Sequence, residues 1–241
     1  MVYRFVIADQ DYGDYAGGRV FYSQAGQPAF PVRLASEIWQ RCLTHWQEQR
    51  PFTLYDPCCG GAYHLAVLAH LYGSDIGTII ASDVDEAVLS LAERNLGLVS
   101  LAGLDGRIAE LTHLLETYHK QAHADALASA TRLRQQWRYT IETNLFCADV
   151  MNKEAVVAGM NGRHADIVFT DVPYGWLSDW QMADPNHPPT WQLLESLRPV
   201  LAENAIVAIA ADKRQKVAHE AYGRLEKFQV GKRRVWLGRP F

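Results

Sequence analysis

Four aspartates of this chain stand where short apolar segments end. They are Asp56 after residues 53–55, Asp83 after 78–81, Asp149 after 144–147 and Asp171 after 166–170. These segments alternate with helical patterns, and the carboxyl ends of parallel strands meet at one edge of a sheet, where α/β folds bind their ligands. We therefore expect the carboxylates to gather at one edge. A site of this composition attracts a cationic ligand and repels phosphate.

A loop of small residues follows the first segment, in the order Asp56-Pro-Cys-Cys-Gly-Gly-Ala62. Gly60 and Gly61 allow a ligand to approach the backbone closely. The loop lacks the GxGxxG pattern that brings a pyrophosphate to a helix N-terminus, which argues against a dinucleotide. The Asp56 carboxylate suits instead the ammonium and sulfonium charges of S-adenosylmethionine. We predict that this cofactor binds here and contacts Asp56, Cys59, Gly60 and Gly61.

Two further acids complete the predicted cofactor site. Asp83 lies 23 residues after Gly60, at the spacing where an acid at a strand end accepts hydrogen bonds from both ribose hydroxyls. Val84 is placed to lie against the adenine ring, and Asp149 is placed to accept a hydrogen bond from the adenine amino group. The alternative for Asp149 is that it caps a following helix.

The segment from Asp171 to Tyr174 reads Asp-Val-Pro-Tyr and follows a buried strand pattern. An exocyclic base amine is a poor nucleophile because its lone pair is delocalised into the ring. An acceptor at Asp171 would hold the N–H groups and localise that lone pair, while Pro173 keeps the turn rigid and Tyr174 stacks on an unstacked base. We predict that these three residues are catalytic; the alternative is a surface turn. Candidates for a lid or stacking platform, or else for packing, are Trp176, Trp180 and His187.

The order of elements predicts a single α/β domain over 1–241. Residues 1–50 form an N-terminal extension with a helix from Pro31, and a stripe of apolar residues over about 98–140 indicates a helical insertion. The rest is typical of a Rossmann-like, mostly parallel seven-stranded sheet with an antiparallel strand. The expected strands are 53–55, 78–81, 144–147, 166–170, 205–210 and a hairpin of 227–230 and 233–238. The expected helices include 62–72, 86–96, 191–201 and 215–225.

Charge is distributed unevenly along the chain. The formal net charge is −4, yet residues 212–241 include nine Lys or Arg against three acids. An acidic body with a basic end can hold a polyanion by one face. Candidate RNA-binding residues, which would contact phosphates and position the substrate, are Lys213, Arg214, Lys216, Lys232, Arg233 and Arg234. The alternative is a solvated charged terminus.

Composition argues against several other classes of protein. No run of about 18 apolar residues occurs, so we expect no membrane span. The apolar stretch before Asp9 is too short for a signal peptide, and the four cysteines contain no CxxC pair, a pattern typical of reduced thiols in the cytoplasm. We find no HExxH, GxSxG or cysteine-rich cluster, so we predict neither a metal site nor a serine nucleophile.

The motifs also carry a family resemblance. Asp56-Pro-Cys-Cys-Gly-Gly61 and Asp171-Val-Pro-Tyr-Gly175 resemble the Asp-Pro-x-Cys-Gly-Ser-Gly and Asp-Pro-Pro-Tyr-Gly motifs of class I RNA guanine-N2 methyltransferases. Gly61, Ala62 and Val172 depart from those motifs, and Val172 in place of the first proline leaves guanine N1 open as a target beside N2. The whole chain, with its aromatic start and helical insertion, is similar to the AviRa family of avilamycin-resistance ribosomal RNA methyltransferases. That resemblance implies methylation of a guanine in 23S ribosomal RNA, free or in the 50S subunit, and resistance to an orthosomycin antibiotic.

Other hypotheses are compatible with these motifs. DNA-adenine and protein-glutamine amino-methyltransferases use related motifs, and a Rossmann-like RNA-binding module that had lost its cofactor would keep the fold. The acids at positions 56, 83 and 171 count against such a non-catalytic module. An NAD oxidoreductase is a more distant alternative. Nothing in the sequence indicates a coiled coil, so a monomer is the default expectation.

Overall fold

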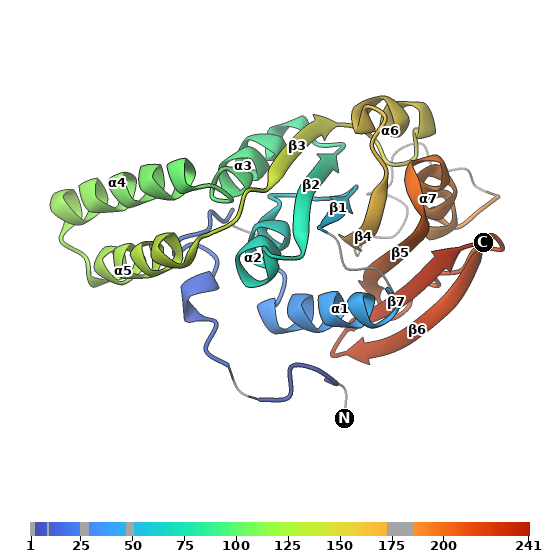
Figure 1. The fold of residues 1–241 in the computed structure, drawn as a ribbon, viewed down its shortest axis with the longest axis horizontal. Coiled ribbons are helices and arrows are strands. Elements are labelled where there is room, and N and C mark those ends of the chain that lie inside the picture. Colours follow the sequence, from blue (N-terminus) through green and yellow to red (C-terminus); the bar gives the residue numbers. More distant parts are fainter. Residues whose placement is uncertain (1–2, 9, 25–28, 47–50, 173–185) are drawn as a thin grey trace.

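A seven-stranded sheet forms the centre of the computed structural model, which describes residues 3–8, 10–24, 29–46, 51–172 and 186–241 (Figure 1). The strands are β1 (Phe52–Asp56), β2 (Ile76–Asp83), β3 (Glu142–Cys147), β4 (Ala165–Asp171), β5 (Leu201–Asp212), β6 (Tyr222–Val230) and β7 (Arg233–Pro240). Their order is β3-β2-β1-β4-β5-β7-β6. The first five run parallel, and β7 is antiparallel to both of its neighbours. The predicted fold class is therefore confirmed.

Helices cover both faces of this sheet. One face packs on α1 (Val32–Thr44), α2 (Tyr63–Tyr72) and α3 (Glu86–Gly97), and the other on α6 (Lys153–Met160) and α7 (Pro189–Leu197). Successive strand residues point to opposite faces, so Leu54 joins the first core and Tyr55 the second. Because both faces are buried, the central strands are nearly continuous apolar runs, as parallel sheets require.

The insertion is a helical hairpin of α4 (Leu101–Tyr118) and α5 (Gln121–Gln136), which projects away from the sheet (Figure 1). The N-terminal extension lies against it. Arg107 of α4 donates to the carbonyl of Val20 at 2.9 Å, and Arg132 of α5 pairs with Asp14. Among the described residues of the extension that precede α1, the regular structure is a 3-10 turn at Gly13–Tyr15, and the rest is loop.

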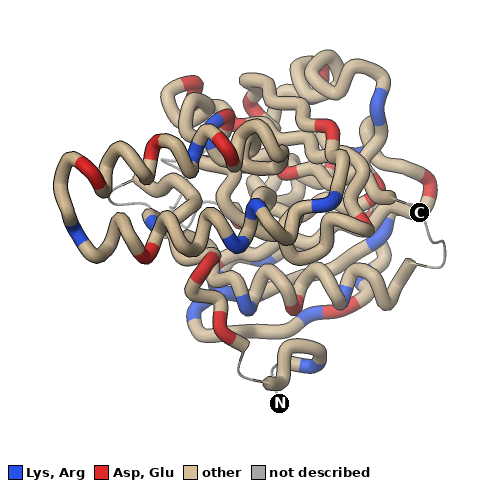
Figure 2. Tube along the Cα trace, turned by 60° about the vertical axis from the view of Figure 1, so that its left-hand side comes forward, with Lys and Arg blue, Asp and Glu red and all other residues tan. Residues whose placement is uncertain are grey.

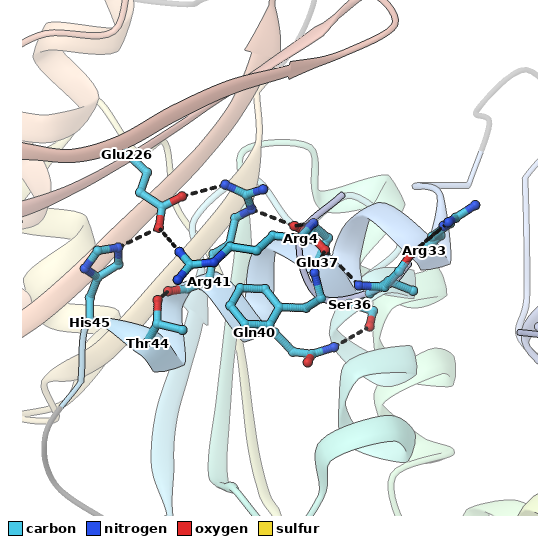
Figure 3. A network of polar contacts seen from close by, with 11 residues as sticks. Arg4, Arg33, Ser36, Glu37, Gln40, Arg41, Thr44, His45 and Glu226 are labelled. Atoms are coloured by element: carbon cyan, nitrogen blue, oxygen red, sulfur yellow. Dashed lines mark hydrogen bonds and ion pairs between the residues drawn. The ribbon is translucent and has the colours of Figure 1, made fainter. Parts of the chain in front are cut away.

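A buried carboxylate anchors the start of the extension on α1 (Figure 3). Glu37 is fully buried and accepts hydrogen bonds from the backbone N–H groups of residues 4–6 at 2.7–3.0 Å. Arg41 lies 2.7 Å from Glu37 and 2.6 Å from Glu226 of β6, which also pairs with His45. Burial opposes ionisation of Glu37, but these hydrogen bonds outweigh it and lower its pKa. The network joins the chain start, α1 and β6.

One predicted element is wrong. Residues 215–225 form no helix; a turn follows Asp212, and β6 begins at Tyr222. The Asp212 side chain accepts from the backbone N–H of Arg214, and the Gln215 side chain accepts from that of Asp212, which closes the turn locally. From Tyr222 onward, backbone hydrogen bonds to β7 hold the chain extended as β6. Tertiary pairing overrides the helical pattern here.

Two smaller differences concern the flanks of β4. The helix expected over 191–201 is α7, which ends at Leu197; a 3-10 turn containing Pro199 follows, and the chain enters β5 at Leu201. Proline has no N–H to continue a helix, which explains the early end. Helix α6 is not among the expected helices, although a helix after Asp149 is the alternative considered for that residue. The first turn of α6 is capped by Asn152, whose side chain accepts from the N–H of Ala155.

Within the described residues, no single helix has the length and apolar character needed to cross a membrane. Helices α3 and α4 reach that threshold only as a pair, and they are bent by 103° relative to one another.

Candidate active site

Three of the predicted carboxylates meet beside the loop that follows β1. Asp56 ends β1, Asp83 ends β2 and Asp171 ends β4, and the parallel registers place these ends at the same edge of the sheet. Burial is the main cause that raises the pKa of Asp56, and the charges of Asp83 and Asp171 raise it further, so both lie within electrostatic reach of Asp56. The structure thus brings them together, and their roles stay a prediction.

Asp56 is a buried acceptor with an unsatisfied oxygen. Its side chain is fully buried, and Oδ1 accepts from the N–H of Cys58 at 3.0 Å. Among the described residues Oδ2 accepts no hydrogen bond, although His64 Nε2 lies 3.2 Å away. Burial is the main cause that raises the pKa of Asp56 to about 8, and burial also lowers the pKa of His64 to about 4. A neutral His64 supplies no positive charge, so a cationic ligand would fit this carboxylate.

The glycine loop is fixed by Asp83. Gly60 donates its N–H to Asp83 Oδ2 at 2.8 Å, and Asp85 donates to Oδ1 at 3.0 Å. Each oxygen keeps a further lone pair with which to bind a ligand. Gly60 has φ +49°, and a Cβ there would meet no described atom within 4 Å, whereas a Cβ on Gly61 would lie 2.8 Å from Leu91. The loop is therefore open on one side and packed on α3 on the other.

The remaining predicted cofactor residues occupy the rim of the same edge. Val84 is 44% exposed beside Asp83, so its side chain is available to a ring. Asp149 accepts from the N–H of Met151 at 2.9 Å and so closes the turn before α6, whose cap is Asn152. Burial is the main cause that raises the pKa of Cys58, and the charge of Asp149 adds to it, so Asp149 lies within electrostatic reach of the loop. Cys59 is buried, and burial raises the pKa of its thiol.

The N-terminal extension forms one wall of the cleft at this loop, a feature that the sequence did not indicate. The cleft is lined on one side by Tyr22, Phe30 and their neighbours, and on the other by residues 58–61, Tyr63, His64, Leu91 and Asp171. Asn95 of α3, fully buried, joins the two sides. It accepts from the N–H of Tyr22 at 2.8 Å and donates to the carbonyls of Tyr22 at 3.1 Å and Gly61 at 2.8 Å. A lone asparagine in a helical pattern carries no signal that would have identified it.

Asp171 lies in the same cleft, at the end of β4. Its carboxylate contacts Arg233 of β7 at 3.4 Å, and Val172 continues the chain beside β5 by donating to the carbonyl of Ala210. Pro173 and Tyr174, the other predicted catalytic residues, lie outside the described residues, as do Trp176 and Trp180. His187 stacks on Trp191 with 4.1 Å between ring centroids, so it packs on α7.

The two predicted basic clusters meet at this edge. Asp212 is paired with Arg233 across β5 and β7, and Lys213 donates its N–H to the carbonyl of Lys232 at 3.0 Å. Lys213, Lys216 and Lys232 are exposed, and Arg214 pairs with Asp212 at 2.8 Å. The sequence left open which edge the β6–β7 turn would reach; it reaches the edge that holds Asp171. On the α4–α5 hairpin, by contrast, basic and acidic positions are interspersed (Figure 2).

A sheet of this order, with a glycine loop after β1 and acids ending β1, β2 and β4, is the arrangement of a class I methyltransferase. The model of the family described as rRNA methyltransferase AviRa matches residues 1–233. The chain belongs to this family.

Relatives of known name agree with that membership. The chain is 40% identical over 242 residues to a 23S rRNA (guanine(2535)-N(1))-methyltransferase of Streptomyces viridochromogenes, covering 98% of this chain and 95% of the relative. It is similar to the solved structure of the rRNA methyltransferase aviRa from the same organism, with a TM-score of 0.90, 38% identity, and coverage of 99% and 96% of the two chains. A structure of TrmN from Thermus thermophilus matches at 16% identity and a TM-score of 0.50, over 87% of this chain and 49% of that one, and shares the fold.

Proposed function

We propose that this methyltransferase transfers a methyl group from S-adenosylmethionine to N1 of one guanine in 23S ribosomal RNA. The single observation that carries the proposal is the position of Asp171, which lines the same cleft as the glycine loop and so places an acceptor beside the predicted cofactor site. The relative named for guanine N1 methylation, 40% identical over 98% of this chain, supports N1 over N2. Val172 in place of the first proline of the N2 motif points the same way.

We propose the cofactor site from the residues around the loop. Asp56 would hold the cationic amino-acid end, the open side of Gly60 would take the ligand close to the backbone, and Asp83 would accept from the ribose. Val84 and Asp149 would face the adenine. When bound, S-adenosylmethionine supplies an electrophilic methyl group on a sulfonium sulfur. The unsatisfied, buried oxygen of Asp56 and the carboxylates around it fit a ligand with positive charge.

The protein's own residues then act on the base. Asp171 would accept a hydrogen bond from the N1–H group of the guanine. The exposed lysines at positions 213, 216 and 232 would contact phosphates and fix the orientation of the RNA. Positioning of this kind supplies much of the catalytic effect in an in-line transfer. We further propose action in the cytoplasm, as a monomer, with resistance to avilamycin as the consequence that the family resemblance implies.

The test is methyl transfer from tritiated S-adenosylmethionine to unmodified 23S RNA and to 50S subunits, with the label mapped by digestion and mass spectrometry. We expect 1-methylguanine at one position. Asp171→Asn should lower the single-turnover rate by about 10² or more, the typical contribution of a positioned proton acceptor, and should leave cofactor binding intact. Asp125→Asn, on the exposed surface of α5, is the matched control. Full activity of Asp171→Asn, or label on DNA or protein in place of RNA, contradicts the proposal.

A further inference from the structure

Among the predicted RNA-binding residues, Arg233 has a distinctive place. Its Nη2 lies 3.4 Å from Asp171 Oδ2, and its guanidinium lies over the ring of Phe30, 5.0 Å from the centroid. Both side chains are partly accessible, Arg233 at 22% and Asp171 at 20%. Phe30 and Asp171 line the cleft. Arg233 therefore borders the site of the base and is poorly placed for a phosphate on the outer surface.

The strand register explains why Arg233 takes this place and its neighbours do not. Ala210 of β5 is paired with Asp171 on one side and with Val235 on the other. Arg233 lies two residues from Val235 and so shares its face, while Arg234 points to the opposite face. Strand β5 lies between β7 and β4, so the long Arg233 side chain crosses β5 to reach the Asp171 carboxylate.

We propose that Arg233 acts on the guanine itself, donating a hydrogen bond to O6 and stabilising the negative charge that develops across N1, C6 and O6 as Asp171 takes the N1 proton. The inference rests on the proposed N1 function and deepens it. Guanine N1 forms its bond to the methyl carbon as the sulfonium–methyl bond breaks, and the N1 proton passes to the Asp171 carboxylate. The electron pair of the N–H bond becomes that of the new N–C bond, so the product base is neutral.

The chemistry requires such a group. Guanine N1 carries its proton at neutral pH, and a carboxylate alone is a weak base for it. A fixed cation beside O6 lowers the cost of removing that proton, because donors aimed at developing charge act strongly in a partly dry site. The planar guanidinium has five N–H donors and can hold a carboxylate with some and O6 with others. Adenine carries an amino group at the equivalent position, which donates and cannot accept, so the same contact selects guanine.

The experiment compares Arg233→Gln and Arg233→Lys with the wild type in single-turnover methyl transfer at saturating RNA, across pH, with RNA affinity measured separately. Arg233→Gln should lower the rate by about 10²-fold, as loss of one such donor does elsewhere, and should shift the pH of half-maximal rate upward. Arg233→Lys keeps the positive charge but lacks the planar set of N–H donors, so it should retain part of the rate that Arg233→Gln loses. RNA Kd should change by less than about threefold. Arg224→Gln, the same change at an exposed position of β6, should behave as wild type.

If Arg233 contacts a phosphate and not the guanine, the Arg233 variants should show the opposite pattern. The single-turnover rate at saturating RNA would be unchanged, RNA Kd would rise, and the slope of log affinity against log salt would fall by about 1; this result overturns the proposal. A loss of rate that is the same at every pH also overturns it, since the proton transfer would then not depend on Arg233.

Inosine at the target nucleotide separates failure of this inference from failure of the proposed function. Inosine keeps N1–H and O6 and lacks the 2-amino group. Wild-type methylation of inosine RNA with the same Arg233 dependence supports both proposals. Product on guanosine RNA and none on inosine RNA, with the label recovered as N2-methylguanosine after digestion, identifies N2 as the methylated atom and refutes the N1 function and this role of Arg233 with it.

Discussion

Asn95 offers a sharp test of how the cofactor loop is held. Its side chain is fully buried and makes three hydrogen bonds of 2.8–3.1 Å, two with the backbone of Tyr22 and one with the carbonyl of Gly61. A typical intramolecular hydrogen bond contributes about 1 kcal/mol, and a buried group left without a partner costs more. Asn95→Ala should therefore lower the free energy of unfolding by about 3 kcal/mol. The cofactor Kd should rise as well, because Gly61 belongs to the loop.

Asn95→Asp gives a result with a distinct pH dependence. The introduced carboxyl keeps the acceptor for the N–H of Tyr22, but its other oxygen faces two carbonyl oxygens in a buried site. Burial and that repulsion raise its pKa in the folded state above the unfolded value of about 3.9. The folded state then binds more protons, so the stability of this variant falls relative to wild type as pH rises through the interval between the two pKa values. At pH below about 4 the protonated form can donate, and the deficit should shrink.

Urea unfolding at pH 7 and pH 4, read by tryptophan fluorescence, measures both effects, and calorimetry measures cofactor Kd. Asn152→Ala removes the single cap bond at the start of α6 and should cost about 1 kcal/mol at both pH values. A loss below about 1 kcal/mol for Asn95→Ala, or equal pH dependence of Asn95→Ala and Asn95→Asp, would refute the reasoning.

Three further predictions follow from groups at the site and at the chain start. Asp83→Asn should weaken cofactor binding by about tenfold to a hundredfold, the range for a hydrogen bond to a charged group, and calorimetry would show it; unchanged affinity would exclude Asp83 from the site. Because the pKa of Asp56 is raised to about 8, a cationic cofactor should displace its proton, so affinity should increase from pH 6 toward pH 8 with proton release. Titrations in two buffers of different ionisation enthalpy detect that release, and Asp56→Asn should abolish it. Glu37→Gln should cost about 2 kcal/mol at pH 7, where the wild-type carboxylate binds three backbone N–H groups and Arg41. Its pKa is lowered in the folded state, so the wild-type advantage is lost as pH falls through that pKa, and equal urea midpoints at pH 7 would contradict the prediction.

Several features of this protein are determined by short stretches of sequence. The apolar strands, the helices between them and the acids that end three strands are set by local periodicity and by the rule that parallel strands end at one edge. The glycine loop with Asp56, in place of GxGxxG, indicates a cationic cofactor through its residue types alone. The helical insertion is likewise visible as an apolar stripe. These features depend on residues close together in the chain, and so a pattern can show them.

Only the tertiary structure decided the contacts that complete the site. Residues 222–225 are helical by pattern and extended in the fold because β7 supplies their hydrogen bonds. Asn95 joins Tyr22 across 73 residues, and Arg233 reaches Asp171 across 62. The edge reached by the β6–β7 turn follows from how β7 pairs with β5, which no local propensity encodes. The physical reason is the same in each case: such contacts form when distant segments pack together, and the energy that selects them is that of the whole core.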